Sequence, residues 1–210
     1  MRKSKSAVIM LLVSIVVAIF ITYKLVGAGS VPFDQSSFAF IRDIFPQSMQ
    51  PLFIFITFFG SKYGFAIVGI ALILWLWFWK KDFIGIATVV AAVAIGNELN
   101  LFFKDVILRP RPKLEHLVEV NSYSFPSGHA MVGLILYMIF AYFVIGDLQK
   151  LSTKWLVGLV FGLWILLIGV SRIVLQVHYP SDVLSGFALG YIWTYLMILG
   201  YEFLRFKKRV

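Results

Sequence analysis

The sequence predicts an all-α integral membrane protein with six transmembrane helices and an interfacial helical segment between the first and the second. Two observations support this prediction. Of the 210 residues, 60% are hydrophobic and only 14% are charged, with a mean hydropathy of +0.91, whereas soluble domains are about half apolar and a quarter charged. Six apolar segments are also long enough to cross a hydrocarbon core of about 30 Å. We expect residues 1–210 to form a single six-span domain.

Each apolar segment is expected to be a helix, because it is too long for a strand and because lipid does not tolerate unpaired backbone groups. The first segment follows three basic residues and ends near Val26-Gly27-Ala28, which resembles a signal-peptidase site. Its length favours a retained helix over a cleaved signal peptide. The six segments are Ala7–Val26, Tyr63–Trp79, Phe83–Phe103, His129–Gly146, Trp155–Val174 and Asp182–Leu204.

The stretch from Pro32 to Gly60 is too polar and too often interrupted by proline to span a membrane. Charged residues such as Asp34 and Arg42 separate its phenylalanines. A segment of this composition suits a helix that lies at the surface of the bilayer.

Lysine and arginine residues orient the six helices. If both termini are cytoplasmic, eleven of these residues lie on the cytoplasmic side and eight lie outside, and an excess of positive charge marks the cytoplasmic side. We therefore expect a multi-pass protein of the cell membrane, with the loops after the first, third and fifth helices on the extracytoplasmic side. The net charge of +9 follows from this pattern, so the expected partner is the lipid bilayer and not nucleic acid. The eleven residues are Arg2, Lys3, Lys5, Lys80, Lys81, Lys150, Lys154, Arg205, Lys207, Lys208 and Arg209.

Three short motifs contain the polar residues best suited to chemistry, and all three fall on the predicted extracytoplasmic side. Antiparallel helices joined by short loops are neighbours, so we expect the motifs to converge. They are Lys104-x6-Arg111-Pro112 after the third span, Pro126-Ser127-Gly128-His129 before the fourth, and Ser171-Arg172-x5-His178-x3-Asp182 between the fifth and sixth.

The motifs predict a site for a phosphoryl group. Lys104, Arg111 and Arg172 supply three cations with many hydrogen-bond donors. Ser127 stands where the N-cap of the fourth span belongs, so the amide of Gly128 is expected to open toward solvent. The partial positive charge of a helix N-terminus favours phosphate there.

The two motif histidines indicate phosphoryl transfer. His178 precedes Asp182 by one helical turn, and a carboxylate partner holds one imidazole nitrogen as a donor while the other is left as a nucleophile. His129 is then available to protonate a leaving oxygen. This arrangement predicts a phosphohistidine intermediate. With no cysteine and only three histidines, we expect no metal and no cofactor.

These motifs resemble the signature of the integral-membrane type-2 phosphatidic acid phosphatase superfamily, K-x6-RP, PSGH and SR-x5-H-x3-D, at all eleven specified positions. The resemblance implies a membrane lipid phosphatase that needs no metal and acts on a lipid phosphate. It implies that His178 attacks phosphorus with the help of Asp182 and that His129 is the general acid. The residues implied to hold the phosphate oxygens are Lys104, Arg111, Ser127, Gly128 and Arg172.

The substrate is less constrained, because this family divides chiefly between glycerophospholipid monoesters and polyprenyl diphosphates. Arg109 and Lys113 could supply further cations for a diphosphate, although Arg109 also merely mimics Arg111 in preceding a proline. Glu115 and Glu119 would repel a second phosphate and accept hydrogen bonds from a glycerol headgroup. We therefore expect hydrolysis of phosphatidylglycerophosphate to phosphatidylglycerol, with undecaprenyl diphosphate as the alternative. The location favours that alternative, because the diphosphate carrier is released on the outer leaflet.

A lipid transporter or flippase is the alternative class of function. It predicts polar residues spread along a transmembrane path, whereas the motifs gather at one face. Asn97 and Asn100 share a face of the third span and are expected to bind neighbouring helices. The role of Glu98 stays open, and His116 is expected to be a solvated loop residue.

Overall fold

The computed structural model describes residues 5–114 and 116–207, and it confirms the predicted fold class. These residues contain no strand, and six of their helices are long and apolar enough to cross a membrane. Glu115 and the basic residues Arg2, Lys3, Lys208 and Arg209 lie outside the described residues. The elements are α1 (Lys5–Ala28), α2 (Asp34–Ile44), the 3-10 turn η1 (Gln47–Met49), α3 (Gln50–Phe58), α4 (Lys62–Trp75), the π-helical turn η2 (Leu76–Lys80), α5 (Phe83–Ile107), α6 (Gly128–Asp147), α7 (Leu151–Val174) and α8 (Pro180–Lys207).

The helices extend beyond the apolar segments that predicted them. Helix α5 ends at Ile107 rather than at Phe103, so Lys104 belongs to the helix and not to the loop that follows. Helix α7 begins at Leu151 rather than at Trp155. These extensions place charged residues at fixed positions on helix ends.

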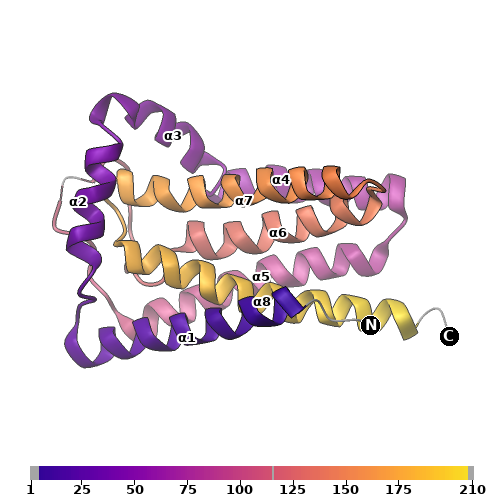
Figure 1. Cartoon of the computed structure of the whole chain (residues 1–210), viewed down its shortest axis with the longest axis horizontal. Helices are drawn as coiled ribbons and strands as arrows, with labels where there is room; N and C mark the ends of the chain where they lie inside the picture. Colours follow the sequence, from indigo (N-terminus) through magenta and orange to yellow (C-terminus); the bar gives the residue numbers. More distant parts are fainter. Residues whose placement is uncertain (1–4, 115, 208–210) are drawn as a thin grey trace.

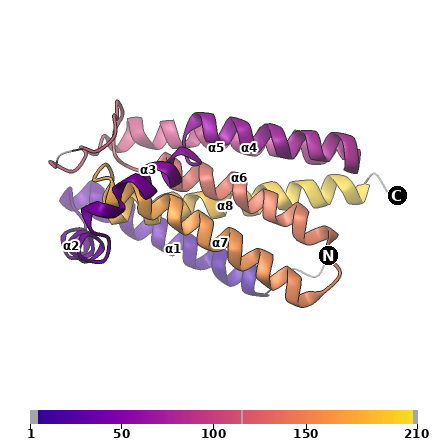
Figure 2. The same ribbon diagram turned by 90° about the horizontal axis from the view of Figure 1, so that it is seen from above.

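Helix α6 forms the centre of the bundle. It contacts α4, α5, α7 and α8, and more than half of its most apolar stretch is buried inside the protein. Figure 1 shows α2 lying across one end of the bundle, whereas α1 begins and α8 ends at the opposite end. In Figure 2, α4 and α5 form one side of the bundle, and α1 and α7 lie on the other. The two ends of the bundle are therefore built differently.

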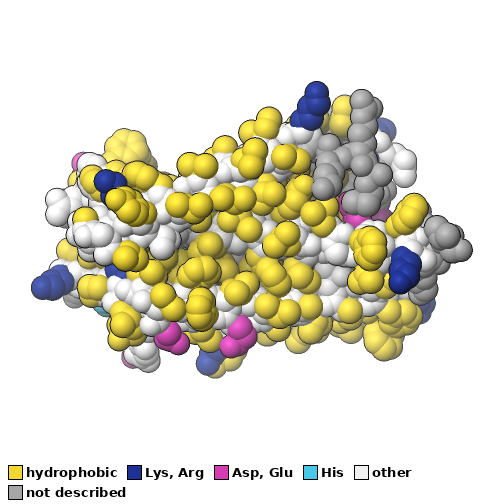
Figure 3. All heavy atoms as spheres, turned by 90° about the horizontal axis from the view of Figure 1, so that it is seen from below, with side chains coloured by type: hydrophobic (Ala, Val, Ile, Leu, Met, Phe, Trp, Pro, Cys, Tyr) yellow, Lys and Arg dark blue, Asp and Glu magenta, His cyan; other side chains and the backbone are white. Residues whose placement is uncertain are grey.

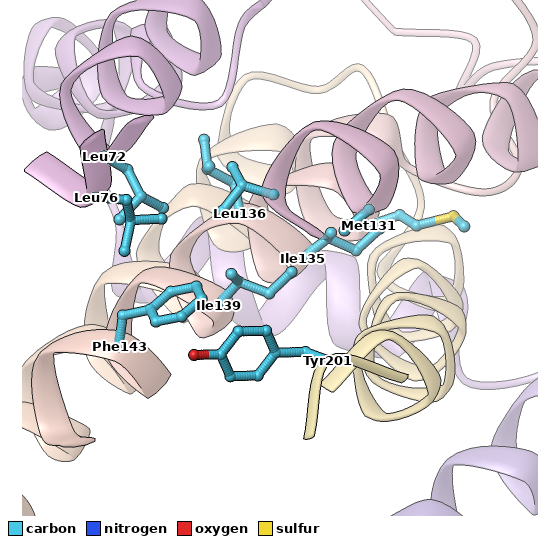
Figure 4. Packing of buried hydrophobic residues seen from close by; sticks show 10 residues of the cluster. Leu72, Leu76, Met131, Ile135, Leu136, Ile139, Phe143 and Tyr201 are labelled. Carbon is cyan, nitrogen blue, oxygen red and sulfur yellow. The ribbon is translucent and has the colours of Figure 1, made fainter. Parts of the chain in front are cut away.

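Apolar side chains form both the core and most of the visible surface. Figure 4 shows Leu136, Ile139 and Phe143 of α6 in one cluster with Leu72 of α4 and Tyr201 of α8. Apolar side chains also cover most of the face seen in Figure 3. A surface of this kind is expected where helices face lipid rather than water.

Two glycines of α8 bring this helix close to α6. A Cβ atom on Gly186 would lie 2.7 Å from the carbonyl oxygen of Ser127, and one on Gly190 would lie 2.7 Å from that of Met131. Small residues allow such an approach between membrane helices. Glycine at these positions therefore sets the distance between the helices that begin at the second and third motifs.

Helices α2 and α3 occupy the stretch that was predicted to be interfacial. Phe40 and Ile44 of α2 are exposed, whereas Asp34 at its start is buried. Helix α3 buries Phe53 and Ile56 in a cluster with residues of α7. The stretch thus packs against the end of the bundle and exposes part of its apolar surface.

Candidate active site

The three motifs lie on four helix ends that meet where α2 crosses the bundle. Lys104 is in the last turn of α5, and His129 is in the first turn of α6. Arg172 is in the last turn of α7, and Asp182 is in the first turn of α8. The convergence expected from antiparallel helices is therefore found (Figure 1).

His178 and Asp182 form a fully enclosed pair. The imidazole Nδ1 lies 3.5 Å from the Asp182 carboxylate and 3.4 Å from the Ser124 hydroxyl. On the other side of the ring, Nε2 lies 3.2 Å from a terminal nitrogen of Arg111. His178 is 2% exposed and Asp182 is 0% exposed. One ring nitrogen therefore faces the carboxylate, and the other faces a cation.

Burial keeps the His178 imidazole neutral. Loss of solvation lowers its pKa to about 3, and the nearby Asp182 carboxylate only partly opposes this shift. Arg172 and Arg111 lower it further. A neutral imidazole retains a free lone pair, which is the form that a nucleophile requires.

The three motif cations surround this pair. Arg111 donates to the carbonyl oxygens of Ser122 (2.7 Å) and Val177 (2.6 Å), which hold its guanidinium beside His178. Lys104 is buried and its ammonium donates to the carbonyl of Tyr123. These contacts tie the loop between α5 and α6 to the nucleophile candidate.

Arg172 reaches the site from α7. One terminal nitrogen donates to the Thr57 hydroxyl at 2.7 Å, at the end of α3. Its buried Nε has no hydrogen-bond partner among the described residues. The carbonyl of Arg172 accepts from the amides of Val177 and His178, which shapes the turn that carries the histidine.

The N-terminus of α6 has the predicted cap. The Ser127 hydroxyl accepts from the amide of Ala130 at 3.4 Å, and the Ser127 amide donates to the carbonyl of Asp182 at 3.0 Å. A Cβ on Gly128 would lie 3.1 Å from the amide oxygen of Asn100. Glycine therefore lets the helix start lie close against α5.

Asn100 fits its expected role, but the expectation for Asn97 is wrong. Asn100 is buried and donates to the carbonyl of Pro126 at 3.2 Å, which braces the second motif from α5. Asn97 is exposed, and its bond is to the neighbouring Glu98 at 3.5 Å. The spacing of the two asparagines was correct for one helix face, but the bundle buries only part of that face.

His129 lies against the end of α3. A Cβ on Gly60 would approach its Cδ2 to 2.7 Å and the Cγ2 of Ile168 to 2.6 Å. The Gly60 amide donates to the carbonyl of Thr57, whose hydroxyl binds Arg172. The turn after α3 thus positions two of the predicted site residues.

Sequence reasoning missed two residues and misjudged a third. Ser124 donates to the Asp182 carboxylate at 2.6 Å, and Asp34 of α2 binds Ser181. Arg109 is neither a mimic of Arg111 nor a spare cation, because its guanidinium is buried between Asp34 (2.6 Å) and Asp182 (2.5 Å). The repeated Arg-Pro dipeptide was the only sequence feature that drew attention to Arg109, and no sequence feature pointed to Asp34.

A cavity of about 350 Å³ adjoins the site between α2 and the loop after α5. Its walls include Pro112 and Tyr179, the neighbours in sequence of Arg111 and His178. Among the described residues, no group of three or more His, Asp and Glu side chains could hold a metal ion. The groups that the site brings together are three cations, two imidazoles, the Asp182 carboxylate and the N-terminus of α6.

Several known proteins are similar to this chain in sequence. The profile of the PAP2 superfamily matches residues 84–206. Phosphatidylglycerophosphatase B of Bacillus subtilis is 37% identical over 125 residues, which are 58% of this chain and 60% of that protein, less than two thirds of its length. An undecaprenyl-diphosphatase of Sulfolobus acidocaldarius is 27% identical over 200 residues, which cover 90% of this chain and 88% of that one.

Solved structures agree on the fold. The crystal structure of a transmembrane PAP2-type phosphatidylglycerolphosphate phosphatase from Bacillus subtilis superposes with a TM-score of 0.76 at 28% identity, covering 93% of this chain and 96% of that one. Aquifex aeolicus LpxE has the same fold, with a TM-score of 0.65 at 22% identity, over 81% of this chain and 97% of that one. Because the profile match includes all three motifs and extends over more than half of the chain, this multi-pass membrane protein belongs to the PAP2 superfamily.

Proposed function

We propose that residues 1–210 act as one domain that hydrolyses a phosphomonoester lipid at the extracytoplasmic face of the cell membrane, converting phosphatidylglycerophosphate to phosphatidylglycerol. The arrangement around His178 carries this proposal. Its Nδ1 is held toward Asp182, and its Nε2 lies 3.2 Å from Arg111. In this structure the Nε2 lone pair faces an Arg111 N–H, and a phosphoryl group that binds Arg111 would take up this donor and meet the lone pair of a neutral imidazole.

The reaction has two steps. In the first, Nε2 of His178 bonds to phosphorus as the ester bond breaks, and His129 donates a proton to the leaving lipid oxygen. In the second, water attacks the phosphohistidine and loses its proton to His129, which releases phosphate and restores His178. Asp182 stabilises the positive charge that develops on the imidazole in the first step.

Fixed positive charge replaces a metal ion in this scheme. Lys104, Arg111 and Arg172 bind the phosphate oxygens, together with the helix start at Ser127 and Gly128. Because these donors are already held in place, they stabilise the transition state without reorganisation. We expect phosphate release to continue in excess EDTA. Loss of activity on chelation, with recovery on adding a divalent ion, would contradict the scheme.

The contacts of Arg109 support a monoester over a diphosphate. Both terminal nitrogens of Arg109 bind carboxylates, so this cation is not available to a second phosphate. Lys113 is exposed and lines the adjoining cavity with Gln35 and Gln176, which suit a hydroxylated headgroup. Undecaprenyl diphosphate stays the alternative substrate, because the relative from Sulfolobus acidocaldarius aligns over most of this chain.

Released phosphate measured on purified protein in detergent tests the activity and its substrate together. We expect turnover of phosphatidylglycerophosphate, at least about tenfold better in kcat/KM than undecaprenyl diphosphate, which is about 1.4 kcal/mol of transition-state binding. His178→Ala should abolish turnover, whereas His116→Ala, at an exposed loop histidine, should retain it. A tenfold preference for the diphosphate would reverse the substrate proposal. Turnover by His178→Ala would refute the mechanism. If the protein released no phosphate but moved lipid between the leaflets of reconstituted vesicles, it would be a flippase.

Thiol labelling tests the proposed face, since the chain has no cysteine of its own. A cysteine at the exposed Asn121, in the loop of the site, should react with an impermeant reagent on intact cells. A cysteine at the exposed Gln149, at the opposite end, should react only after lysis. The reverse pattern would place the site in the cytoplasm.

A further inference from the structure

A buried network connects α2 to the aspartate of the site. Asp34, the first residue of α2, is 4% exposed although it begins a helix at the surface of the bundle. Its carboxylate accepts from the Ser181 amide (2.9 Å), the Ser181 hydroxyl (2.7 Å) and Arg109 (2.6 Å). All three hydrogen bonds go to groups outside α2, so none of them caps this helix.

Arg109 connects Asp34 with Asp182. One terminal nitrogen binds Asp34, and the other binds Asp182 at 2.5 Å and the Ser181 hydroxyl at 2.8 Å. The guanidinium also lies over the ring of Tyr179, with its central carbon 4.1 Å from the ring centroid. The fork geometry of arginine therefore fixes where the Asp182 carboxylate lies.

The two oxygens of Asp182 have separate partners as a result. Oδ1 accepts from Arg109, whereas Oδ2 accepts from Ser124 (2.6 Å) and the Tyr179 amide (2.9 Å) and faces Nδ1 of His178. If Arg109 were free to rotate, it would compete with His178 for both oxygens. The second bond of Arg109, to Asp34, restricts the guanidinium to Oδ1 of Asp182.

Charge gives Asp34 a second effect. Arg109 alone would cancel the negative charge of Asp182, and the carboxylate could then do little to stabilise an imidazolium. Asp34 neutralises Arg109, so the group of three carries one net negative charge beside His178. In a buried site such a charge acts strongly, because little water screens it.

We propose that Asp34 is a positioning residue for catalysis, which acts on His178 through Arg109, Ser181 and Asp182 and so makes the surface helix α2 part of the catalytic machinery. The inference rests on the proposed phosphohistidine mechanism. It assigns α2 a role beyond covering the end of the bundle, because the orientation and charge of the Asp182 carboxylate both depend on its first residue.

Replacement of Asp34 by asparagine tests the proposal. The asparagine side chain would keep an oxygen for the Ser181 amide, but Arg109 would then be paired with Asp182 alone, and the net negative charge beside His178 would be lost. We expect kcat to fall by about tenfold or more while KM changes little, because the transition state and not the bound phosphate is affected. Asp147→Asn is the matched control: it removes a carboxylate from an ion pair with Lys80 at the opposite end of the bundle and should leave kcat unchanged.

A second background separates positioning from structural damage. In Asp182→Asn protein, the residue through which Asp34 acts is absent, so adding Asp34→Asn should cause no further loss of kcat. An equal loss in both backgrounds, or an unchanged kcat in the single variant, would overturn the proposal. Failure of the wild-type protein to release phosphate, or turnover by His178→Ala, would instead refute the proposed function itself.

Ser181→Ala provides a second test that leaves every buried charge in place. It removes the hydroxyl that bridges Asp34 and Arg109, and folding can be checked by thermal unfolding in detergent. If Asp34→Asn does not accumulate as folded protein, this variant decides. A lower kcat that disappears in the Asp182→Asn background supports the proposal, and an unchanged kcat contradicts it.

Discussion

Two aspartates at opposite ends of the bundle have nearly the same partners. Asp182 accepts from a backbone amide, from the Ser124 hydroxyl and from Arg109. Asp82 caps α5 by accepting from the amide of Gly85, and it also binds a tyrosine hydroxyl and Arg205. Amide, hydroxyl and arginine contacts therefore do not by themselves mark a catalytic carboxylate.

Two features separate these carboxylates. Asp182 is 0% exposed, whereas the side chain of Asp82 is 11% exposed and its arginine partner is about half exposed. Asp182 also faces a histidine, and its arginine is shared with a second carboxylate. We infer that the same set of contacts stabilises a helix end at Asp82 and prepares a carboxylate for catalysis at Asp182. The difference is the histidine that Asp182 faces.

The largest expected effect on kcat comes from substituting each of the two aspartates in turn. Asp182→Asn should lower kcat by about 10⁴-fold, because the amide no longer holds the imidazole in the reactive tautomer. Asp82→Ala should leave kcat unchanged and lower the free energy of unfolding by about 1 kcal/mol, as expected for a lost N-cap. Phosphate release and thermal unfolding of both proteins measure this contrast. Equal losses of kcat would mean that both ends serve only the fold.

A smaller effect is expected from the glycines at the two ends. Gly60→Ala would force a Cβ against His129 and Ile168, and a displacement of about 1 Å can cost up to about 100-fold in rate. Gly146→Ala, in α6 at the opposite end, has no atom within 4 Å of the new Cβ and should be neutral. The kcat values of the two variants, with unfolding as a check on folding, test whether the turn after α3 positions His129. A fully active Gly60→Ala would contradict it.

The smallest effect concerns stability in acid. The unfolded chain should titrate His178 near its usual pKa of about 6.5, whereas the folded protein holds it at about 3. Between these values the unfolded state binds the extra proton, so stability falls as the pH drops below about 6.5. His178→Gln should lose less in Tm than the wild type between pH 7 and pH 5, and His116→Gln should follow the wild type. Parallel curves for all three would contradict the buried neutral state.

The sequence predicted the parts of this protein that depend on local pattern. Apolar length predicted six helices, and the spacing within each motif placed His178 one turn before Asp182. The end of α5 was predicted too early, because a lysine after an apolar segment usually marks the end of a transmembrane helix. In the structure Lys104 is buried within the last turn of α5 and donates to the loop that follows. Hydropathy alone does not distinguish a charge at a helix end from a charge enclosed by neighbouring elements.

The contacts of Arg109 and Asp34 could not be predicted in the same way. They are 75 residues apart in sequence, and neither belongs to a periodic pattern. The charge of Asp34 indicated only that its segment was too polar to span a membrane. A buried ion pair between a loop and a surface helix depends on how the bundle closes, which single-sequence patterns do not encode.

The close contact between α6 and α8 has a consequence for how damage to this protein would be recognised. Because Ser127 and Asp182 begin different helices, a larger residue at Gly186 would push the proposed phosphate-binding residues Ser127 and Gly128 away from Asp182 without removing any charged group. Such a protein would retain its six spans and its affinity for phosphate, yet it would turn substrate over slowly. A ligand-binding assay would not distinguish this variant from the wild type, and only a measurement of turnover would detect the defect.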